Sequence, residues 1–161
     1  MHDYESLPPD TRVWIYQGSR PFAEADIPGI REQVKAFAQR WVSHNRALRS
    51  YGDVWHDRFV VLMVDETRAG ASGCSIDTSV HFLQDLAEAT GVDLFDRMIF
   101  TYRDNTTRAI QSAPREEFMA LYQQGKIDDD TVVFDNLIQR KADFEDRWEK
   151  RLADSWHKRM D

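Results

Sequence analysis

The segment from Gly70 to Asp77 combines residue types that favour anion binding. It reads Gly-Ala-Ser-Gly-Cys-Ser-Ile-Asp, and its small residues precede a predicted helix that runs from about Ser75 to Thr90. Small residues let main-chain N–H groups approach a ligand, and a helix N-terminus presents unpaired donors and a positive dipole end. Helix capping by Ser75, with Asp77 favourable in the first turn, explains the same residues without a ligand. Both interpretations stand on the sequence alone.

The same segment fails the test for a nucleotide phosphate loop. That loop requires Gly, four residues, Gly, Lys and then Ser or Thr. Gly73 and Ser75 fit, but Cys74 stands at the lysine position and Arg68 at the first glycine position. Without the lysine, the β- and γ-phosphate charge lacks its usual partner, so ATP hydrolysis by this loop is not expected.

Cys74 is the candidate catalytic residue, because a cysteine at a helix N-terminus can act as a nucleophile. The neighbouring carboxylates Asp65, Glu66 and Asp77 oppose this, since like charge disfavours a thiolate. His81 lies seven residues along the same helix, about 10 Å away at 1.5 Å per residue, beyond direct hydrogen bonding. A thiol-dependent enzyme is therefore the alternative function, and a buried or half-buried cysteine that packs as a small hydrophobe is favoured.

The histidines show no metal-ligand spacing. They stand at His2, His44, His56, His81 and His157. The acidic run at 128–130 is typical of a solvated loop. We expect neither a metal nor another cofactor.

Hydrophobic spacing predicts the elements that position these residues. Strands are favoured by β-branched and aromatic residues, or by continuous apolar runs, at 12–17, 48–56, 59–64 and around 98–102. Helical spacing of three and four residues marks Ile27, Ile30, Val34, Phe37 and Trp41, and the helix after Ser75 follows the same period. The order strand, helix, strand, strand, helix, strand predicts an α+β protein with a ferredoxin-like βαββαβ sandwich over residues 12–104.

Residues 105–161 are expected to form a C-terminal extension packed on this core as one structural unit. It contains a turn at 104–105, a helix after Ser112, a strand at 131–134, and a final helix with apolar residues at intervals of four from Phe144 to Trp156. The run 59–64 is apolar throughout, so the extension or a partner subunit must cover the open face of the sheet.

Four aromatic residues of the predicted strands are expected on this open face: Trp14, Tyr16, Tyr51 and Trp55. We favour a second core under the extension. Stacking of RNA bases on exposed aromatics is the alternative.

The predicted topology brings scattered residues to one edge of the sheet. The first and third strands are expected to be adjacent and parallel, so the loops 18–25 and 66–74 would meet at their ends. The second and fourth strands would start at the same edge. The ligand-binding residues predicted at this edge are Gln17, Arg20, Arg49, Asp65, Cys74, Ser75, Asp77 and Arg97.

Composition and charge exclude several function classes. The 161-residue chain has a formal net charge of −7, with 28 acidic and 21 basic residues. Phosphate-backbone binding depends on Lys and Arg, so neither nucleic acid nor an anionic membrane is an expected partner. No apolar stretch approaches the roughly 20 residues that span a bilayer. The start of the sequence lacks signal-peptide features, and a single cysteine fits a reducing compartment, so a cytoplasmic location is expected.

Several blocks of the sequence resemble a known family. They are Val13–Gln17, Val64–Glu66, Gly73–Asp77, Gly91–Arg97, Thr131–Leu137 and Asp154–Arg159. Over nearly the whole chain they resemble an uncharacterised protein family of Bacteroidota, whose members are often labelled ABC transporter ATPase. The resemblance implies no established activity. Residues 102–134 are also weakly similar to GYF-type peptide-binding modules, although the Gly-Tyr-Phe signature is absent.

The sequence as a whole favours a small, non-catalytic binding or interaction protein. Its ligand would be a small anion or a protein partner, held at the edge that contains Asp65, Cys74, Ser75 and Asp77. Arginine forks suit carboxylate or phosphate oxygens, and three arginines are expected there. A structural homodimer, built on the open sheet face, is the third interpretation.

Overall fold

The apolar run that predicts a central strand is the middle strand of a three-stranded sheet. In the computed structural model, which describes residues 3–67 and 69–159, β5 (Phe59–Asp65) lies between β1 (Arg12–Gln17) and β4 (Arg49–Trp55). Every residue of β5 is buried. A turn with positive φ at His56 and Asp57 joins β4 to β5, a conformation that suits the twist of a tight hairpin.

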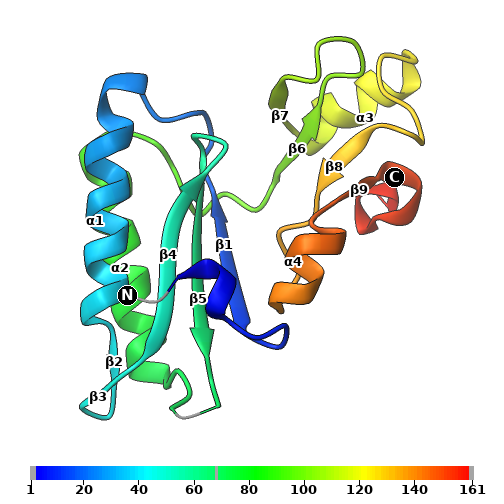
Figure 1. Cartoon of the computed structure of the whole chain (residues 1–161). Helices are drawn as coiled ribbons and strands as arrows, with labels where there is room; N and C mark the ends of the chain where they lie inside the picture. Colours follow the sequence, from blue (N-terminus) through cyan, green and yellow to red (C-terminus); the bar gives the residue numbers. More distant parts are fainter. Residues whose placement is uncertain (1–2, 68, 160–161) are drawn as a thin grey trace.

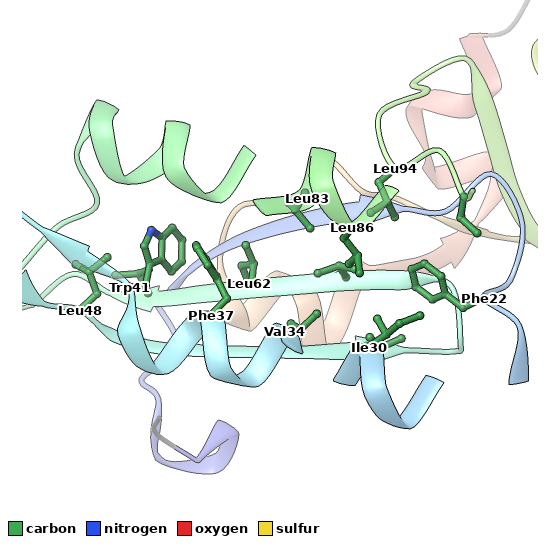
Figure 2. Close-up of a cluster of buried hydrophobic side chains, with 14 residues drawn as sticks. Phe22, Ile30, Val34, Phe37, Trp41, Leu48, Leu62, Leu83, Leu86 and Leu94 are labelled. Atoms are coloured by element: carbon green, nitrogen blue, oxygen red, sulfur yellow. The ribbon is translucent and has the colours of Figure 1, made fainter. Parts of the chain in front are cut away.

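Helices α1 (Ile27–Arg40) and α2 (Gly73–Thr90) cover one face of this sheet (Figure 1). Their apolar faces meet Leu62 and the other inward residues of the strands (Figure 2). Asp26 precedes α1 without a capping hydrogen bond from its side chain, and Pro28 stands in the first turn. Gly91, with φ of 71°, ends α2 in the left-handed conformation that glycine adopts readily.

The C-terminal half builds a second, four-stranded sheet. Its strands run in the order β7 (Ile110–Pro114), β6 (Ile99–Arg103), β8 (Val132–Phe134) and β9 (Glu149–Arg151). The remaining helices are α3 (Arg115–Gln123) and α4 (Lys141–Arg147). A small hairpin of β2 (Val42–Ser43) and β3 (Arg46–Ala47) follows α1. The turn predicted at 104–105 is confirmed, and the strand predicted at 131–134 is observed as β8.

The extension covers the open face of the first sheet, as expected. Phe134, Phe144 and Trp148 pack against Phe59 and the other residues that β5 turns away from the helices. Tyr51 and Trp55 belong to this second core. Trp14 and Tyr16 do not, because they pack on the helix side, and there the prediction is wrong.

The α+β class is confirmed, whereas the complete ferredoxin-like sheet is not. The strand order of the first sheet is β1-β5-β4. The outer strands β1 and β4 are parallel, and α1 lies between them in the sequence. Strand β5, which a hairpin joins to β4, lies between them in the sheet. The strand expected fourth, β6, belongs instead to the second sheet, so this sheet begins before the predicted boundary at residue 104.

Two further predictions are corrected by the strand pairing. The first and third strands, β1 and β5, are adjacent but antiparallel, with Arg12 opposite Val64 and Gln17 opposite Phe59. The final helix is also shorter than predicted: α4 ends at Arg147, and the chain then pairs with β8 as β9. The unpaired edge of β8 is the physical reason, since a ladder of main-chain hydrogen bonds satisfies it.

No helix in the described part of the chain combines the length and apolar character needed to cross a bilayer.

Gly52 of β4 provides a test of the packing between α1 and the sheet. A Cβ atom there would lie 3.1 Å from Leu62 Cδ2 and 3.2 Å from the Val34 carbonyl oxygen. We expect Gly52→Ala to lower the free energy of unfolding by about 1–3 kcal/mol through overpacking. Gly29→Ala is the control, because nothing lies within 4 Å of its Cβ position in α1 and alanine favours a helix by up to ~1 kcal/mol. Urea denaturation measures both, and equal stabilities would contradict the close approach.

Candidate functional site

The eight predicted site residues fall into two groups at opposite ends of the first sheet. Gln17 lies opposite Phe59, where β5 begins, whereas Asp65 ends β5 and lies opposite Arg49. Six residues at about 3.3 Å each separate these ends by roughly 20 Å. The expectation that all eight converge is therefore wrong. The loops that follow two antiparallel neighbouring strands leave the sheet at opposite ends.

The group at the Asp65 end stabilises the fold. Asp65 is 2% exposed. Its Oδ2 lies 3.2 Å from Nη1 of Arg49, and its Oδ1 accepts a hydrogen bond from the Thr67 N–H. Arg49 also donates to the carbonyl oxygen of Ser6, so this ion pair attaches the N-terminal segment to the end of the sheet.

The start of α2 is occupied by a capping box. Ser72, not Ser75, is the N-cap: its Oγ accepts from the Ser75 N–H, and the Ser75 Oγ accepts from the Ser72 N–H. Ser75 is buried, and its carbonyl oxygen accepts the indole N–H of Trp41. Glu66 places a carboxylate oxygen 2.9 Å from the Ala71 N. These contacts satisfy donors that an anion would need, so the structure favours the capping interpretation.

Cys74 stands exposed in the first turn of α2. A thiol enzyme needs a base within hydrogen-bond reach of the sulfur. Among the residues that the structure describes, none makes a hydrogen bond to the Cys74 thiol. Asp77 is exposed one turn into the same helix. In the same part of the chain, no group of three or more His, Cys, Asp or Glu residues could hold a metal ion.

The other end of β1 borders a pocket of about 440 Å³, which lies between the two sheets. The end of β1, the 94–99 segment after α2, the loop after β8 and the C-terminal turn all contribute to its walls. Tyr16, Phe95 and Trp156 are among its aromatic lining residues, and Gln17, Arg97 and Asn136 are among its polar ones. The volume falls within the range typical of small-ligand sites. Of the predicted residues, only Gln17 and Arg97 line this pocket.

Arg20 lies at the same end of the sheet, outside the pocket lining. Its guanidinium is 3.5 Å from the carbonyl oxygens of Thr90 and Gly91, at the C-terminus of α2. A cation there complements the negative end of the helix dipole.

The side chain of Gln17 is the centre of a hydrogen-bond chain beside the pocket. Its Nε2 donates to the Ile99 carbonyl oxygen at 2.8 Å, and its Oε1 accepts from Thr101 Oγ1 at 2.7 Å and from Asn136 Nδ2 at 2.9 Å. Further donors extend the chain on both sides: Arg58 through Ser112 to Thr101, and the Trp148 indole to Asn136. The chain thus fixes β1, the second sheet and the loop after β8 relative to one another.

Asp135 and Lys150 form a second polar cluster behind the pocket wall. Lys150 Nζ lies 2.7 Å from Asp135 Oδ2, while the Trp156 indole N–H and the Leu137 N–H donate to Oδ1. Burial raises the pKa of Asp135, but these hydrogen bonds outweigh it and keep the pKa below its ordinary value. The carboxylate is therefore ionised and holds the Trp156 ring in place.

His157 lines the pocket and is 2% exposed. Its ring stacks on Trp156 with a centroid distance of 3.7 Å, and its Nδ1 lies 2.6 Å from Ser155 Oγ. Burial lowers the pKa of His157 to about 4; Asp135 opposes this shift and Lys150 adds to it. The imidazole is therefore neutral at physiological pH.

Exposed apolar side chains and two charged residues, Asp96 and Arg97, stand at the pocket. Phe95 and Leu137 are 37% and 61% exposed, and Met98, next to the lining residues, is 62% exposed. In the described residues, no ion pair or hydrogen bond involves the Arg97 side chain. Burial raises the pKa of Tyr16, and its hydrogen bond with Ser79 and the charge of Arg97 act in the opposite direction.

Sequence reasoning missed Asn136, Trp156 and His157. They lie more than 110 residues after Gln17, and the last two fell in or beside a helix that the structure replaces with β9 and short turns. One signal was present: Asp135 and Asn136 are polar residues directly after a buried strand, a position where side chains often reach a site.

Replacing Gln17 tests the hydrogen-bond chain. Gln17→Leu removes an acceptor from Thr101 and Asn136 and a donor from Ile99. We expect the free energy of unfolding to fall by at least about 2 kcal/mol, because buried polar groups are left unsatisfied. Gln84→Leu, on the exposed side of α2, is the matched control and should change it by less than about 0.5 kcal/mol. Urea unfolding of both variants checks this, and a neutral Gln17→Leu would contradict the role of the amide.

The pKa of His157 predicts a pH dependence of stability. The unfolded chain has the ordinary value near 6.5, so between pH 6.5 and about 4 it binds more protons than the folded protein. The free energy of unfolding must therefore fall as the pH falls through this window, by up to about 3 kcal/mol. Burial also lowers the pKa of His56, which acts in the same direction.

His157→Gln separates the two histidines. We expect urea unfolding at several pH values from 4.5 to 7.5 to show a clearly smaller slope in this variant than in the parent protein. The slope is the measurement because the variant can lower stability at every pH. Equal slopes would mean that His157 is not a buried neutral imidazole.

Comparison with protein-family models, curated proteins and solved structures gives no match for this chain. The resemblance to the Bacteroidota family therefore stays a prediction.

Proposed function

We propose that the protein is a non-catalytic binding protein whose ligand occupies the pocket between the two sheets. The observation that carries this proposal is the make-up of the pocket lining. Its polar residues Gln17 and Asn136 are fixed by hydrogen bonds to protein partners. The lining also includes the exposed apolar side chains of Phe95 and Leu137 and the charged residues Asp96 and Arg97. Preformed walls and exposed apolar side chains favour binding of a ligand with an apolar body.

The polar groups near the pocket support binding rather than catalysis. The Asp135 carboxylate accepts three hydrogen bonds, which leaves it no role as a base. Ser155 is 7% exposed, and its Oγ already contacts both the ring and the main-chain N–H of His157. A nucleophile needs a base beside it and an open path to substrate, and this buried pair offers no such path.

The ligand expected from Arg97 carries a carboxylate or another anionic group. An arginine fork binds such oxygens in a bidentate manner. Tyr16 and Phe95, whose rings lie 5.7 Å apart, offer aromatic surface next to it. This proposal keeps the anionic ligand of the sequence analysis but moves its site from residues 65–77 to the opposite end of the sheet. We place the protein in the cytoplasm. The thiol-dependent enzyme and the homodimer stay predictions.

Thermal stabilisation by a defined ligand panel tests this function. We expect at least one member of a panel of aromatic and aliphatic carboxylates to raise Tm, and Arg97→Ala to abolish the rise. Arg46→Ala is the matched control, because Arg46 is an exposed arginine of the β2–β3 hairpin, at the opposite end of the molecule. A rise that is equally large in Arg97→Ala and Arg46→Ala would move the site away from the pocket.

A further inference from the structure

Strand β1 forms an edge of the three-stranded sheet, and its main chain has an inner and an outer side. Gly18 N donates to the Arg58 carbonyl oxygen, and the register continues with Tyr16 opposite Val60. Hydrogen-bonded pairs alternate along an antiparallel ladder. The main-chain N–H and C=O groups of Gly18, Tyr16 and every second residue before them therefore point toward β5. The N–H and C=O groups of Val13, Ile15 and Gln17 therefore point outward.

Residues 139–141 of the same polypeptide pair with only the start of this outer side. Val13 N donates to the Gln139 carbonyl oxygen at 2.9 Å, and Lys141 N donates to the Thr11 carbonyl oxygen at 2.9 Å. The pairing is antiparallel and consists of the single bridge between Arg12 and Arg140. Farther along, no hydrogen bond in the described residues reaches the N–H groups of Ile15 or Gln17 or the C=O of Ile15.

The unpaired stretch lies in the pocket. Ile15, Tyr16 and Gln17 all line it, together with Phe95 and Leu137 from two other segments. From Ile15 to Gln17 the open edge measures roughly 7 Å at about 3.3 Å per residue. Unpaired main-chain groups on an edge strand are a template for another strand.

We propose that the ligand of this pocket is a peptide segment in extended conformation, which adds to the outer edge of β1 and continues the pairing begun by residues 139–141. This inference rests on the proposed function and names its ligand class. About three residues of the peptide pair with the open stretch of β1. Main-chain hydrogen bonds to Ile15 and Gln17 supply affinity, and alternate side chains contact the apolar walls near Phe95 and Leu137.

The pattern of donors and acceptors selects a peptide over a compact metabolite. The outward N–H groups of Ile15 and Gln17 are two residues apart, about 6.6 Å along the strand, with the C=O of Ile15 between them. An extended main chain presents the complementary groups with this period, whereas a small rigid molecule does not.

The geometry also selects a single chain over a second copy of the protein. The open edge lies inside a pocket bordered by the 94–99 segment and the loop after β8. A second β1 would bring its own flanking loops into the same space. A terminus or a linker of a partner protein has no folded neighbours and fits between these walls.

Peptide N-methylation tests the inference without changing the protein. A phage-displayed library of random linear heptapeptides is selected on the full chain, and the tightest binder is synthesised with each amide N-methylated in turn. We expect methylation at alternate amides to weaken binding by about tenfold or more, since each blocks one hydrogen bond. The amides between them should change affinity less than about threefold. Uniform effects along the peptide, or no enriched peptide at all, would overturn the inference.

Ile15→Pro tests the same edge from the protein side. Proline removes the outward N–H and is tolerated on an edge strand. Ile15→Ala, which keeps this N–H and shortens the side chain, is the matched control. We expect Ile15→Pro to weaken binding of the selected peptide at least about tenfold relative to Ile15→Ala. Equal affinities of the two variants would overturn the inference, and a Pro variant that fails to fold leaves the methylated peptides as the deciding measurement.

The outcomes separate this inference from the proposed function. If carboxylates raise Tm through Arg97 but no peptide binds, the pocket holds a small molecule, and only the peptide inference fails. If neither class binds, both fail. If sedimentation shows a dimer that Ile15→Pro dissociates, the edge pairs with a second copy and the peptide inference is wrong.

Discussion

The amide of Gln17 is the contact on which the arrangement of the two sheets depends. Its carbonyl oxygen accepts from Thr101 and Asn136, and its N–H donates to Ile99, so one side chain joins β1 to two segments of the C-terminal half. Each hydroxyl has one proton to donate. Arg58 can only donate, so the protons run from Arg58 through Ser112 and Thr101 to Gln17. A part-buried chain with one consistent direction fixes the pocket walls before any ligand arrives, because a shift of either sheet would leave several groups unsatisfied.

The elements of the first sheet could be predicted from the sequence, but the direction of β5 was assigned incorrectly. The apolar run at residues 59–64 predicted a central strand, and the structure buries all seven residues of β5. The tight turn at His56 and Asp57 makes β5 antiparallel to β4. Because α1 returns the chain, β4 is parallel to β1. A strand inserted between these two must oppose both. Burial and the hairpin therefore carry enough information to give the observed direction.

The candidate site shows a second limit of prediction from the sequence. Gln17 and Arg97 were predicted as site residues, but for a convergence with Asp65 and Cys74 that antiparallel pairing excludes. Trp148, Leu152 and Trp156 follow helical spacing in the sequence, yet Trp148 packs in one core and Leu152 and Trp156 in another. Periodicity describes a local face, and it cannot show that the chain turns to pair with β8. The contribution of Trp156 and His157 to the pocket follows from that long-range pairing, for which the local sequence has no signal.

An open sheet edge can bind a partner strand, but it can also cause aggregation, because it pairs with any other exposed strand. The protein covers the start of the β1 edge with residues 139–141 and borders the rest with the 94–99 segment and the loop after β8. Segments that flank an edge strand hinder the approach of a second sheet, so these walls protect against aggregation. No described residue satisfies the outward main-chain groups of Ile15, which lines the pocket. The segments that keep another sheet away from the β1 edge thus leave a gap that a single extended chain can enter. Binding at this edge therefore depends on the contacts that hold the two sheets together.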